Sequence, residues 1–277
     1  MPELPEVETM CRGVRPAVGG IIEKVLDPKC TFRPIQCEPT IGSIHRRLKG
    51  TSITGVSRIG KRVVIETDDW ALVLQPKMSG LVSIDVPPDP NHVRLVLLLS
   101  GVAIPKLTFW DSRGLGTIRL IERGEVQRTL VDGKFGPDAL VISFAEFAER
   151  LAATRRPIKV ALLDQKLLAG IGNLYASEML HAAGIDPRRM ASTIDRKKLL
   201  DLYRHMRRIL FKAIEHEGST LSDGTYRNAL NKAGSYQNAH RVYDRADEAC
   251  PRCRDSNIVR IVQSQRSTFY CPRCQVF

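Results

Sequence analysis

Four cysteines near the end of the chain constrain its fold more than any other feature. They form two pairs, Cys250-Pro-Arg-Cys253 and Cys271-Pro-Arg-Cys274, which are separated by the seventeen residues 254–270. Two such pairs at this distance are typical of a tetrahedral site in which four thiolates bind one zinc ion. Two redox-active dithiols are the alternative. Because closed four-ligand zinc sites are structural, we expect one structural Zn²⁺ that stabilises this part of the chain without taking part in chemistry.

The stretch between the two cysteine pairs predicts a β-hairpin. Residues 258–262 and 267–270 have the composition of two strands, and residues 263–266 form the tip between them. The tip is polar and ends in Arg266. A zinc-stabilised hairpin of this kind therefore offers an arginine at its tip to a partner.

Composition excludes several classes of protein. The 277 residues are 43% hydrophobic and 26% charged, which is typical of a folded chain of roughly two domains. The longest apolar run, residues 95–99, is far shorter than the ~20 residues of a membrane span. The first residues are acidic and contain proline, unlike a signal segment. We therefore expect a cytoplasmic protein without membrane contact.

The chain is strongly basic. Lys and Arg number 42 against 30 Asp and Glu, which gives a formal net charge of +12 and a pI near 9.6. Residues 151–216 alone carry 13 basic and 6 acidic side chains. An excess of this size favours a polyanionic partner, although composition alone equally allows a merely soluble basic protein.

The pattern of strands and helices predicts an α+β fold. After an initial helix, residues 1–130 contain short apolar runs separated by Gly, Pro and Asp, which is typical of a β-rich domain. Residues 131–143 are a linker, and residues 144–237 have helical periodicity. Within the latter, residues 218–237 are rich in Gly, Ser, Asn and Asp and predict a long functional or mobile loop. The zinc hairpin, residues 238–277, completes the chain.

The first residues predict either a nucleophile or an ordinary helix start. Pro2 is small enough to allow removal of Met1, which would leave a free secondary amine. An α-amino group has a pKa near ~8, against about 10.4 for a lysine side chain, so a substantial fraction is unprotonated near neutral pH, as a Schiff-base nucleophile must be. Glu3 adjoins this amine. The alternative stays open, because Pro5 and acidic residues in a first turn are common at helix starts.

Two glycines mark a turn between two helical segments. Gly170-Ile-Gly172 is followed by Asn173, a favourable N-cap residue for the second helix. Backbone amides and the helix dipole at such a turn favour a bound phosphate. A dinucleotide-binding turn is excluded, because Tyr175 stands where a third glycine is needed and no strand precedes the turn.

Three blocks of sequence occur together in a characteristic order. They are Pro2-Glu-Leu-Pro-Glu-Val-Glu8, then Leu162-Leu-Asp-Gln165 with Ala169-Gly-Ile-Gly-Asn-Leu-Tyr-Ala-Ser-Glu178, and finally Gln265-Arg-Ser-Thr-Phe-Tyr-Cys271. In these blocks the chain resembles the formamidopyrimidine-DNA glycosylase family, which is related to endonuclease VIII, and the resemblance spans essentially the whole chain. It implies a β-sandwich-like N-terminal domain, a helical domain with a helix–two-turn–helix motif, and a zinc-finger hairpin with four cysteine ligands.

The resemblance also implies an enzyme of base excision repair. Such a DNA glycosylase and abasic-site lyase excises oxidised purines, for example 8-oxoguanine and formamidopyrimidines, and then cleaves the strand by β,δ-elimination. Its partner is double-stranded DNA that contains damaged bases. A monomer associated with the bacterial nucleoid is the expected form.

Candidate site residues follow from the matching positions. Pro2 would attack C1′ of the extruded nucleotide to form an iminium, with Glu3 as its acid/base partner. Lys61 would contact a phosphate and assist elimination. Arg266 would bind the phosphates beside the lesion and assist the final elimination. The other positions that the resemblance places on DNA are His92, Arg113, Arg155 and Asn173.

The chain departs from the family where side chains fill the space left by the extruded base. Met78 and Arg113 match two of the three inserted side chains. The third position holds Leu115 rather than an aromatic residue, Gly114 replaces a second arginine, and residues 75–77 are Gln-Pro-Lys instead of His-Leu-Gly. We therefore expect the chemistry of the family with a lesion and opposite-base preference of its own.

Two other functions remain open. The first is a lyase of the same fold with a shifted preference, for oxidised pyrimidines or for abasic sites alone. The second is a non-catalytic protein that binds damaged DNA. The departures at residues 75–77, 114 and 115 favour it, and the intact Pro2, Glu3, Lys61 and Arg266 disfavour it. The resemblance further implies that residues 218–237 cover the extruded base.

Overall fold

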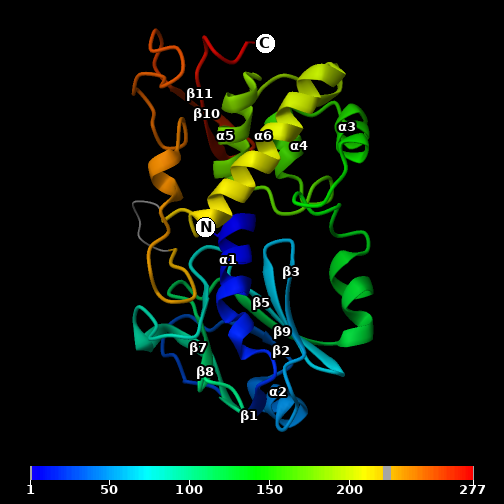
Figure 1. The fold of residues 1–277 in the computed structure, drawn as a ribbon, viewed down its shortest axis with the longest axis vertical. Coiled ribbons are helices and arrows are strands. Elements are labelled where there is room, and N and C mark those ends of the chain that lie inside the picture. The colour runs from blue at the N-terminus through cyan, green and yellow to red at the C-terminus, as the bar shows by residue number, and fades with distance from the viewer. Residues whose placement is uncertain (1, 221–225, 277) are drawn as a thin grey trace. The chain divides into compact units, whose positions relative to one another are not determined.

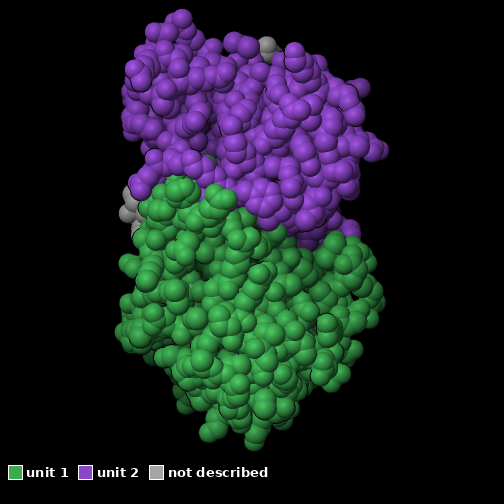
Figure 2. Space-filling view, viewed as in Figure 1, with its two compact units in different colours: residues 1–132, 214–237 green, residues 133–213, 238–277 purple. Residues whose placement is uncertain are grey.

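The computed structural model describes residues 2–220 and 226–276 (Figure 1). The chain divides into two compact units, which are coloured separately in Figure 2. Unit 1 comprises residues 1–132 and 214–237, and unit 2 comprises residues 133–213 and 238–277. This division differs from the predicted domain ranges at residues 214–237, which belong to unit 1. The domain ranges expected from the sequence, 1–130, 144–237 and 238–277, stay predictions.

Unit 1 contains two β-sheets that share one hydrophobic core. The first sheet has the order β1-β7-β8-β6 and the second the order β2-β9-β5-β4-β3, in which only the β2–β9 pair is parallel. The strands are β1 Ile21–Leu26, β2 Gln36–Glu38, β3 Gly55–Ile59, β4 Arg62–Glu66, β5 Trp70–Gln75, β6 Leu81–Ser83, β7 Val93–Ser100, β8 Lys106–Trp110 and β9 Thr117–Glu122. Short helical segments are α2 Ile41–Leu48, η1 Arg15–Ala17, η2 Pro90–His92, η3 Arg123–Glu125 and η4 Gln127–Val131.

Strand β4, which lies inside the five-stranded sheet, has a continuous run of apolar residues because both of its faces are covered. Val63 and Ile65 belong to the main core, whereas Val64 between them belongs to a smaller cluster with Val73 and Leu130. Successive side chains of a strand point to opposite faces, so both faces of this strand are covered by apolar contacts. The predicted α+β fold, with its β-sandwich-like first part, is confirmed.

Helix α1, Leu4–Val14, begins at the residues that the sequence singles out (Figure 1). Glu3 is its N-cap residue, and Pro5 lies in its first turn, where the missing N–H of proline costs no helical hydrogen bond. Val7 and Met10 are fully buried in the core of unit 1. The apolar face of the helix is therefore anchored, and its N-terminal end holds a fixed position within the unit.

Residues 214–237 belong to unit 1, and described apolar side chains of this segment pack into the core of the unit; residues 221–225, within the predicted loop 218–237, lie outside the described residues. Tyr226 and Ala229 are almost completely buried in the same cluster as helix α1. A Cβ atom added to Gly13 of α1 would lie 2.3 Å from the Cβ of Ala229. A side chain at position 13 would therefore displace this segment from the helix.

Unit 2 is mainly helical and ends in a β-hairpin. Its elements are α3 Phe144–Ala152, α4 Ile158–Leu163, α5 Asn173–Ala183, most of α6 Arg196–Glu215, η5 Ala191–Thr193, β10 Val259–Gln263 and β11 Arg266–Tyr270, and the turn η6 Tyr236–Ala239 lies at the unit boundary. Helix α5 ends at Gly184, whose φ of +64° is the left-handed conformation that glycine adopts at helix ends. None of the described helices is long and apolar enough to cross a membrane.

Candidate functional site

The N-terminal end of α1 is a buried and hydrogen-bonded site in unit 1. Pro2 and Glu3 are both buried, and the backbone N–H of Glu3 donates to Oε2 of Glu6 at 2.9 Å. The other carboxylate oxygen of Glu6 accepts the N–H of Ser219, also at 2.9 Å. Glu6 therefore connects the start of the helix to the segment that returns from residue 214. The sequence predicts Glu6 only as an acidic residue of a first helical turn. An acidic side chain three residues after an N-cap also signals its bond to Glu3, whereas its bond to Ser219 was not predicted.

Lys61 lies on the tight turn between β3 and β4, next to Gly60 with a φ of +57°. Arg58 holds this turn, because its Nε donates to Oε2 of Glu8 at 3.0 Å and its Nη1 donates to the carbonyl oxygen of Gly60 at 2.9 Å. Burial opposes ionisation of Glu8, but the hydrogen bonds from Arg12 and Arg58 lower its pKa below the usual value. Helix α1 thus fixes the turn that carries Lys61.

A buried carboxylate organises the loops that carry Met78 and Arg113. Both side chains are exposed, whereas Asp111 is fully buried. The hydroxyl of Ser79 donates to Oδ1 of Asp111 at 2.5 Å, and the N–H of Arg113 donates to the same oxygen at 3.2 Å. Oδ2 accepts the N–H of Gly116 at 2.7 Å. One side chain therefore joins the two loops on which sequence reasoning placed inserting residues.

We expect Asp111→Ala to lower the free energy of unfolding by about 3 kcal/mol, because each buried donor left without its acceptor costs roughly 1–3 kcal/mol. Urea denaturation of purified protein measures this change. Asp68→Ala is the matched control, since Asp68 is an exposed carboxylate in the turn between β4 and β5, and it should change stability by less than about 0.5 kcal/mol. Equal stability of both variants would contradict the organising role of Asp111.

The departure at position 114 has a structural cause. Gly114 has a φ of +60°, and a Cβ there would lie 2.5 Å from the carbonyl oxygen of Arg33. No side chain fits this backbone, so an arginine at this position would require another loop conformation. Leu115, which follows, is half-buried.

His92 lies at the end of η2 and is held by its neighbours. Its Nε2 is 3.5 Å from Oδ2 of Asp89, and its ring centroid is 4.3 Å from that of Phe32. The ring of Trp110 meets it edge-on at 6.0 Å. The imidazole is therefore fixed in orientation and half-buried rather than free in solvent.

In unit 2, Asn173 has a contact that differs from the predicted one. Gly172, rather than Asn173, is the N-cap residue of α5, so the predicted capping role is wrong. The side-chain amide of Asn173 instead donates to the carbonyl oxygen of Ser267 in the hairpin at 2.9 Å. Lys159, which is 1% exposed, donates to the same carbonyl at 2.9 Å and to the hydroxyl of Thr268 at 2.7 Å. The side chain of Asn173 thus makes a hydrogen bond to the distant hairpin instead of capping its own helix.

The hairpin tip is narrower than predicted. Gln263 and Arg266 are paired at the ends of β10 and β11, which leaves Ser264 and Gln265 as the two turn residues. Both have positive φ, +47° and +62°, as the two-residue turns of hairpins require. Arg266 is exposed beside this turn, and Arg155 is exposed between α3 and α4.

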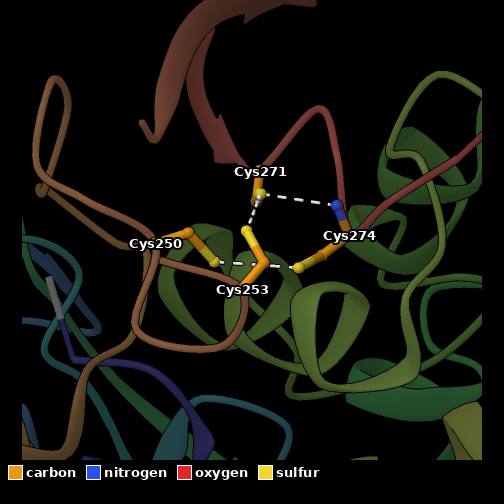
Figure 3. Close-up of side chains that lie close together, drawn as sticks. All are labelled: Cys250, Cys253, Cys271 and Cys274. Carbon is orange, nitrogen blue, oxygen red and sulfur yellow. Dashed lines mark hydrogen bonds between the residues drawn. The ribbon is translucent and has the colours of Figure 1, made fainter. Parts of the chain in front are cut away.

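The four predicted zinc ligands converge within unit 2 (Figure 3). Their sulfur atoms all lie within 4.8 Å of one another, with Cys250 to Cys274 at 3.8 Å and Cys253 to Cys271 at 3.7 Å. Zn–S bonds of about 2.3 Å in a tetrahedron place sulfurs roughly 3.8 Å apart. The donor set and its spacing therefore fit one structural zinc ion. Nε2 of the buried His181 lies 3.4 Å from the sulfur of Cys250, a contact that sequence reasoning missed.

Glu178 is another residue that sequence reasoning left without a role. Its carboxylate is 2% exposed and accepts the backbone N–H groups of Arg241, Val242 and Tyr243 at 2.8–3.1 Å. Burial raises the pKa of Glu178, while these amide donors act in the opposite direction. The segment that leads into the zinc module is thereby held on α5. An acidic residue within the otherwise apolar and small residues of α5 was the available signal.

Three family profiles match the chain, and together they cover most of it. Residues 1–118 match the "Formamidopyrimidine-DNA glycosylase N-terminal domain", and residues 135–225 match the "Formamidopyrimidine-DNA glycosylase H2TH domain". Residues 247–276 match the "Zinc finger found in FPG and IleRS". The predicted helix–two-turn–helix region and the zinc module are thus confirmed.

Individual relatives extend over the full length. A formamidopyrimidine-DNA glycosylase of Chloroflexus aurantiacus is 36% identical over 281 residues, which is 100% of this chain and 98% of that protein. The protein of the same name from Bacillus subtilis is 34% identical and covers 99% of both chains. The solved structure of the Lactococcus lactis Fpg with "an abasic site containing DNA" has a TM-score of 0.86 at 30% identity and covers 99% of both chains. The Thermus thermophilus MutM (FPG) structure has a TM-score of 0.85 at 34% identity, covering 99% of this chain and 98% of that one.

Proposed function

The chain belongs to the formamidopyrimidine-DNA glycosylase family, and from that premise we propose that it excises oxidised purines from duplex DNA and cleaves the resulting abasic site. The substrates would be 8-oxoguanine and formamidopyrimidines. The observation that carries this proposal is the buried N-terminal end of α1, where Pro2 and Glu3 lie together and Glu6 fixes the start of the helix. Such a site suits a nucleophile that must be positioned rather than mobile.

The proposed reaction begins with the amine of Pro2, once Met1 has been removed; Met1 lies outside the described residues. The nitrogen lone pair forms a bond to C1′ while the bond from C1′ to the base breaks, and the base leaves with a proton. Opening of the sugar ring gives an iminium. Loss of a C2′ proton then expels the 3′ phosphate, and loss of a C4′ proton expels the 5′ phosphate. Glu3 is the proposed acid and base in these proton transfers.

The DNA phosphates are the proposed partners of the cationic side chains. Lys61, on the turn held by Arg58, would bind the phosphate at the reacting nucleotide, and exposed Arg266 would bind the phosphates that leave. The net charge of +12 supports a polyanionic partner. Further proposed DNA contacts are His92, Arg113, Arg155, Asn173, Met78 and Leu115. An enzyme of this kind works on the genome, so we propose a cytoplasmic, nucleoid-associated location.

A lyase with a shifted lesion preference is the second candidate, favoured by two features of the loop that carries Arg113. The loop at Gly114 admits no side chain, and Leu115 stands where the family resemblance implies an aromatic residue. Stacking of an aromatic on a base contributes about 1–3 kcal/mol, and burial of a leucine contributes roughly 1.5–3 kcal/mol. Because these two energy ranges overlap, Leu115 can insert in place of an aromatic residue. It lacks a flat ring, however, so it should discriminate between bases differently.

A panel of duplexes separates the two candidates. Each duplex carries one lesion opposite each of the four bases, and strand cleavage is measured under single-turnover conditions. We expect oxidised purines to be excised at least about tenfold faster than oxidised pyrimidines, since a pocket that hydrogen-bonds one base edge rejects another strongly. Cleavage of abasic duplex with inactivity on every purine lesion would support the second candidate instead. Inactivity on all substrates, with retained binding, would indicate the non-catalytic DNA-binding protein.

A further inference from the structure

Phe32 is a large apolar side chain that unit 1 leaves exposed. It lies in the connection between β1 and β2, and 51% of its surface is accessible. Its ring stacks at a tilt of 35° on the ring of His92, with centroids 4.3 Å apart. Single exposed apolar residues are common on protein surfaces, so the significance of Phe32 depends on what lies beside it.

The neighbour of Phe32 in the chain touches the loop of the inserting residues. The carbonyl oxygen of Arg33 would lie 2.5 Å from a Cβ on Gly114, and the Cβ of Arg33 would lie 3.3 Å from it. The two loops are therefore in van der Waals contact at this point. The missing side chain of Gly114 is what lets the backbone of residues 32–33 approach so closely.

Arg94 holds this contact from below the surface. It is 3% exposed, its Nη1 donates to the carbonyl oxygen of Arg33 at 2.8 Å, and its Nε donates to the carbonyl oxygen of Asp111 at 2.9 Å. Among the described residues Arg94 has no carboxylate partner. A buried guanidinium used on two carbonyl groups in different loops holds these loops at a fixed separation. The carboxylate of Asp111 in turn accepts the hydroxyl of Ser79, which lies beside Met78.

Phe32, Met78 and Arg113 are thus three exposed side chains on loops that one buried network connects. The loop of Arg113 carries Leu115 where an aromatic residue would offer a flat stacking face, while Phe32 offers such a face from the adjacent loop. One face of its ring is used by His92 and half of its surface stays accessible. An aromatic ring fixed on one side is well suited to stack on a base with the other.

We propose that Phe32 is a base-stacking residue of the DNA site and that it binds the nucleobase left unpaired opposite the extruded nucleotide. This inference rests on the proposed function, because an enzyme that extrudes a nucleotide from duplex DNA leaves the opposite base unpaired. Arg94 is its positioning residue. Phe32 takes over the stacking that residue 115 cannot provide, so the opposite base is contacted from two loops instead of one.

The test uses an uncleavable abasic-site analogue placed opposite 2-aminopurine, whose fluorescence falls when it stacks. We expect wild-type protein to quench this fluorescence and Phe32→Ala to lose the quenching and bind the duplex about 5- to 150-fold more weakly. Phe32→Tyr retains an aromatic face and should stay within about twofold of wild type. Val86→Ala is the matched control, since Val86 is an exposed apolar residue of the same unit. Wild-type affinity and quenching in Phe32→Ala would overturn the proposal.

Cleavage of a natural abasic duplex by the wild-type protein, measured in parallel, tests the proposed function separately. If the wild type cleaves and Phe32→Ala stacks normally, the inference about Phe32 fails and the enzyme assignment stands. If the wild type quenches the fluorescence but does not cleave, and Phe32→Ala does not quench it, the stacking role stands and the catalytic assignment fails.

Discussion

A chain in which one glycine precedes Pro2 is expected to lose the covalent adduct that borohydride traps with abasic-site DNA, by a factor on the order of 10⁴ or more, as for other lost nucleophiles. The nitrogen of Pro2 would then belong to a peptide bond, whose delocalised lone pair cannot form an iminium. The chain that starts at Pro2 and the chain with one glycine before Pro2 can both be released from cleavable fusion proteins that differ in this single residue. Gel analysis of labelled DNA after borohydride treatment measures the adduct.

A second variant separates the role of the free amine from that of the proline ring. Pro2→Gly retains an N-terminal amine and should retain a detectable adduct, whereas the chain with an additional glycine before Pro2 should give none. Both proteins should bind an uncleavable abasic duplex within about threefold of wild type, since that binding depends mainly on the phosphate contacts. Undiminished trapping by the glycine-extended chain would show that another residue is the nucleophile.

Features encoded by short spacing could be predicted from sequence. The two Cys-x-x-Cys pairs indicated the ligand set, because each knuckle brings its two sulfurs together and only the closure between knuckles depends on the fold. The first turn of α1, which contains Pro5, followed from the ordinary chemistry of helix starts. In both cases the decisive contacts lie within a few residues of one another.

Contacts between distant segments could not be predicted in this way. Asp111 organises a loop that begins more than thirty residues earlier in the chain, and Arg94 connects Arg33 to Asp111. Glu178 accepts amides from a segment sixty-three to sixty-five residues later. A lone acidic or basic residue in the sequence does not reveal which backbone groups will surround it. Asn173 shows the same limit, since its capping propensity was outweighed by a hydrogen bond to the hairpin.

The hairpin has three kinds of support, which have different strengths: hydrogen bonds, a small apolar cluster and the zinc site. The carbonyl oxygen of Ser267 accepts a charge-assisted hydrogen bond from Lys159 and a neutral one from Asn173, each contributing about 0.5–3 kcal/mol. The apolar cluster around Ile258 and Phe269 is small. A two-stranded hairpin is marginally stable by itself, whereas structural zinc contributes about 10–16 kcal/mol in small modules. The metal is therefore the dominant support of the position of Arg266.

The double variant Cys253→Ser/Cys274→Ser is expected to lose the bound zinc and the structure of the hairpin, because only two thiolates remain. Arg266 then no longer has a fixed position, and affinity for abasic duplex should fall about 10- to 100-fold, as expected for the loss of one charge-assisted contact. Zinc is measured by elemental analysis and affinity by fluorescence anisotropy. Cys37→Ser is the control, since the sulfur of Cys37 lies outside the cluster and donates to the carbonyl oxygen of Pro39, which a hydroxyl can also do.

Comparison with Arg266→Ala identifies how the metal acts. If zinc serves DNA binding only by positioning Arg266, the double cysteine variant and Arg266→Ala should weaken binding to a similar degree, and combining them should add little. The amide exchange of unit 1 should stay unchanged in all three proteins, because the zinc ligands and the contacts that hold the hairpin belong to unit 2. Full DNA affinity in a zinc-free double variant would show that the hairpin is held by its hydrogen bonds alone and that the metal is dispensable for the site.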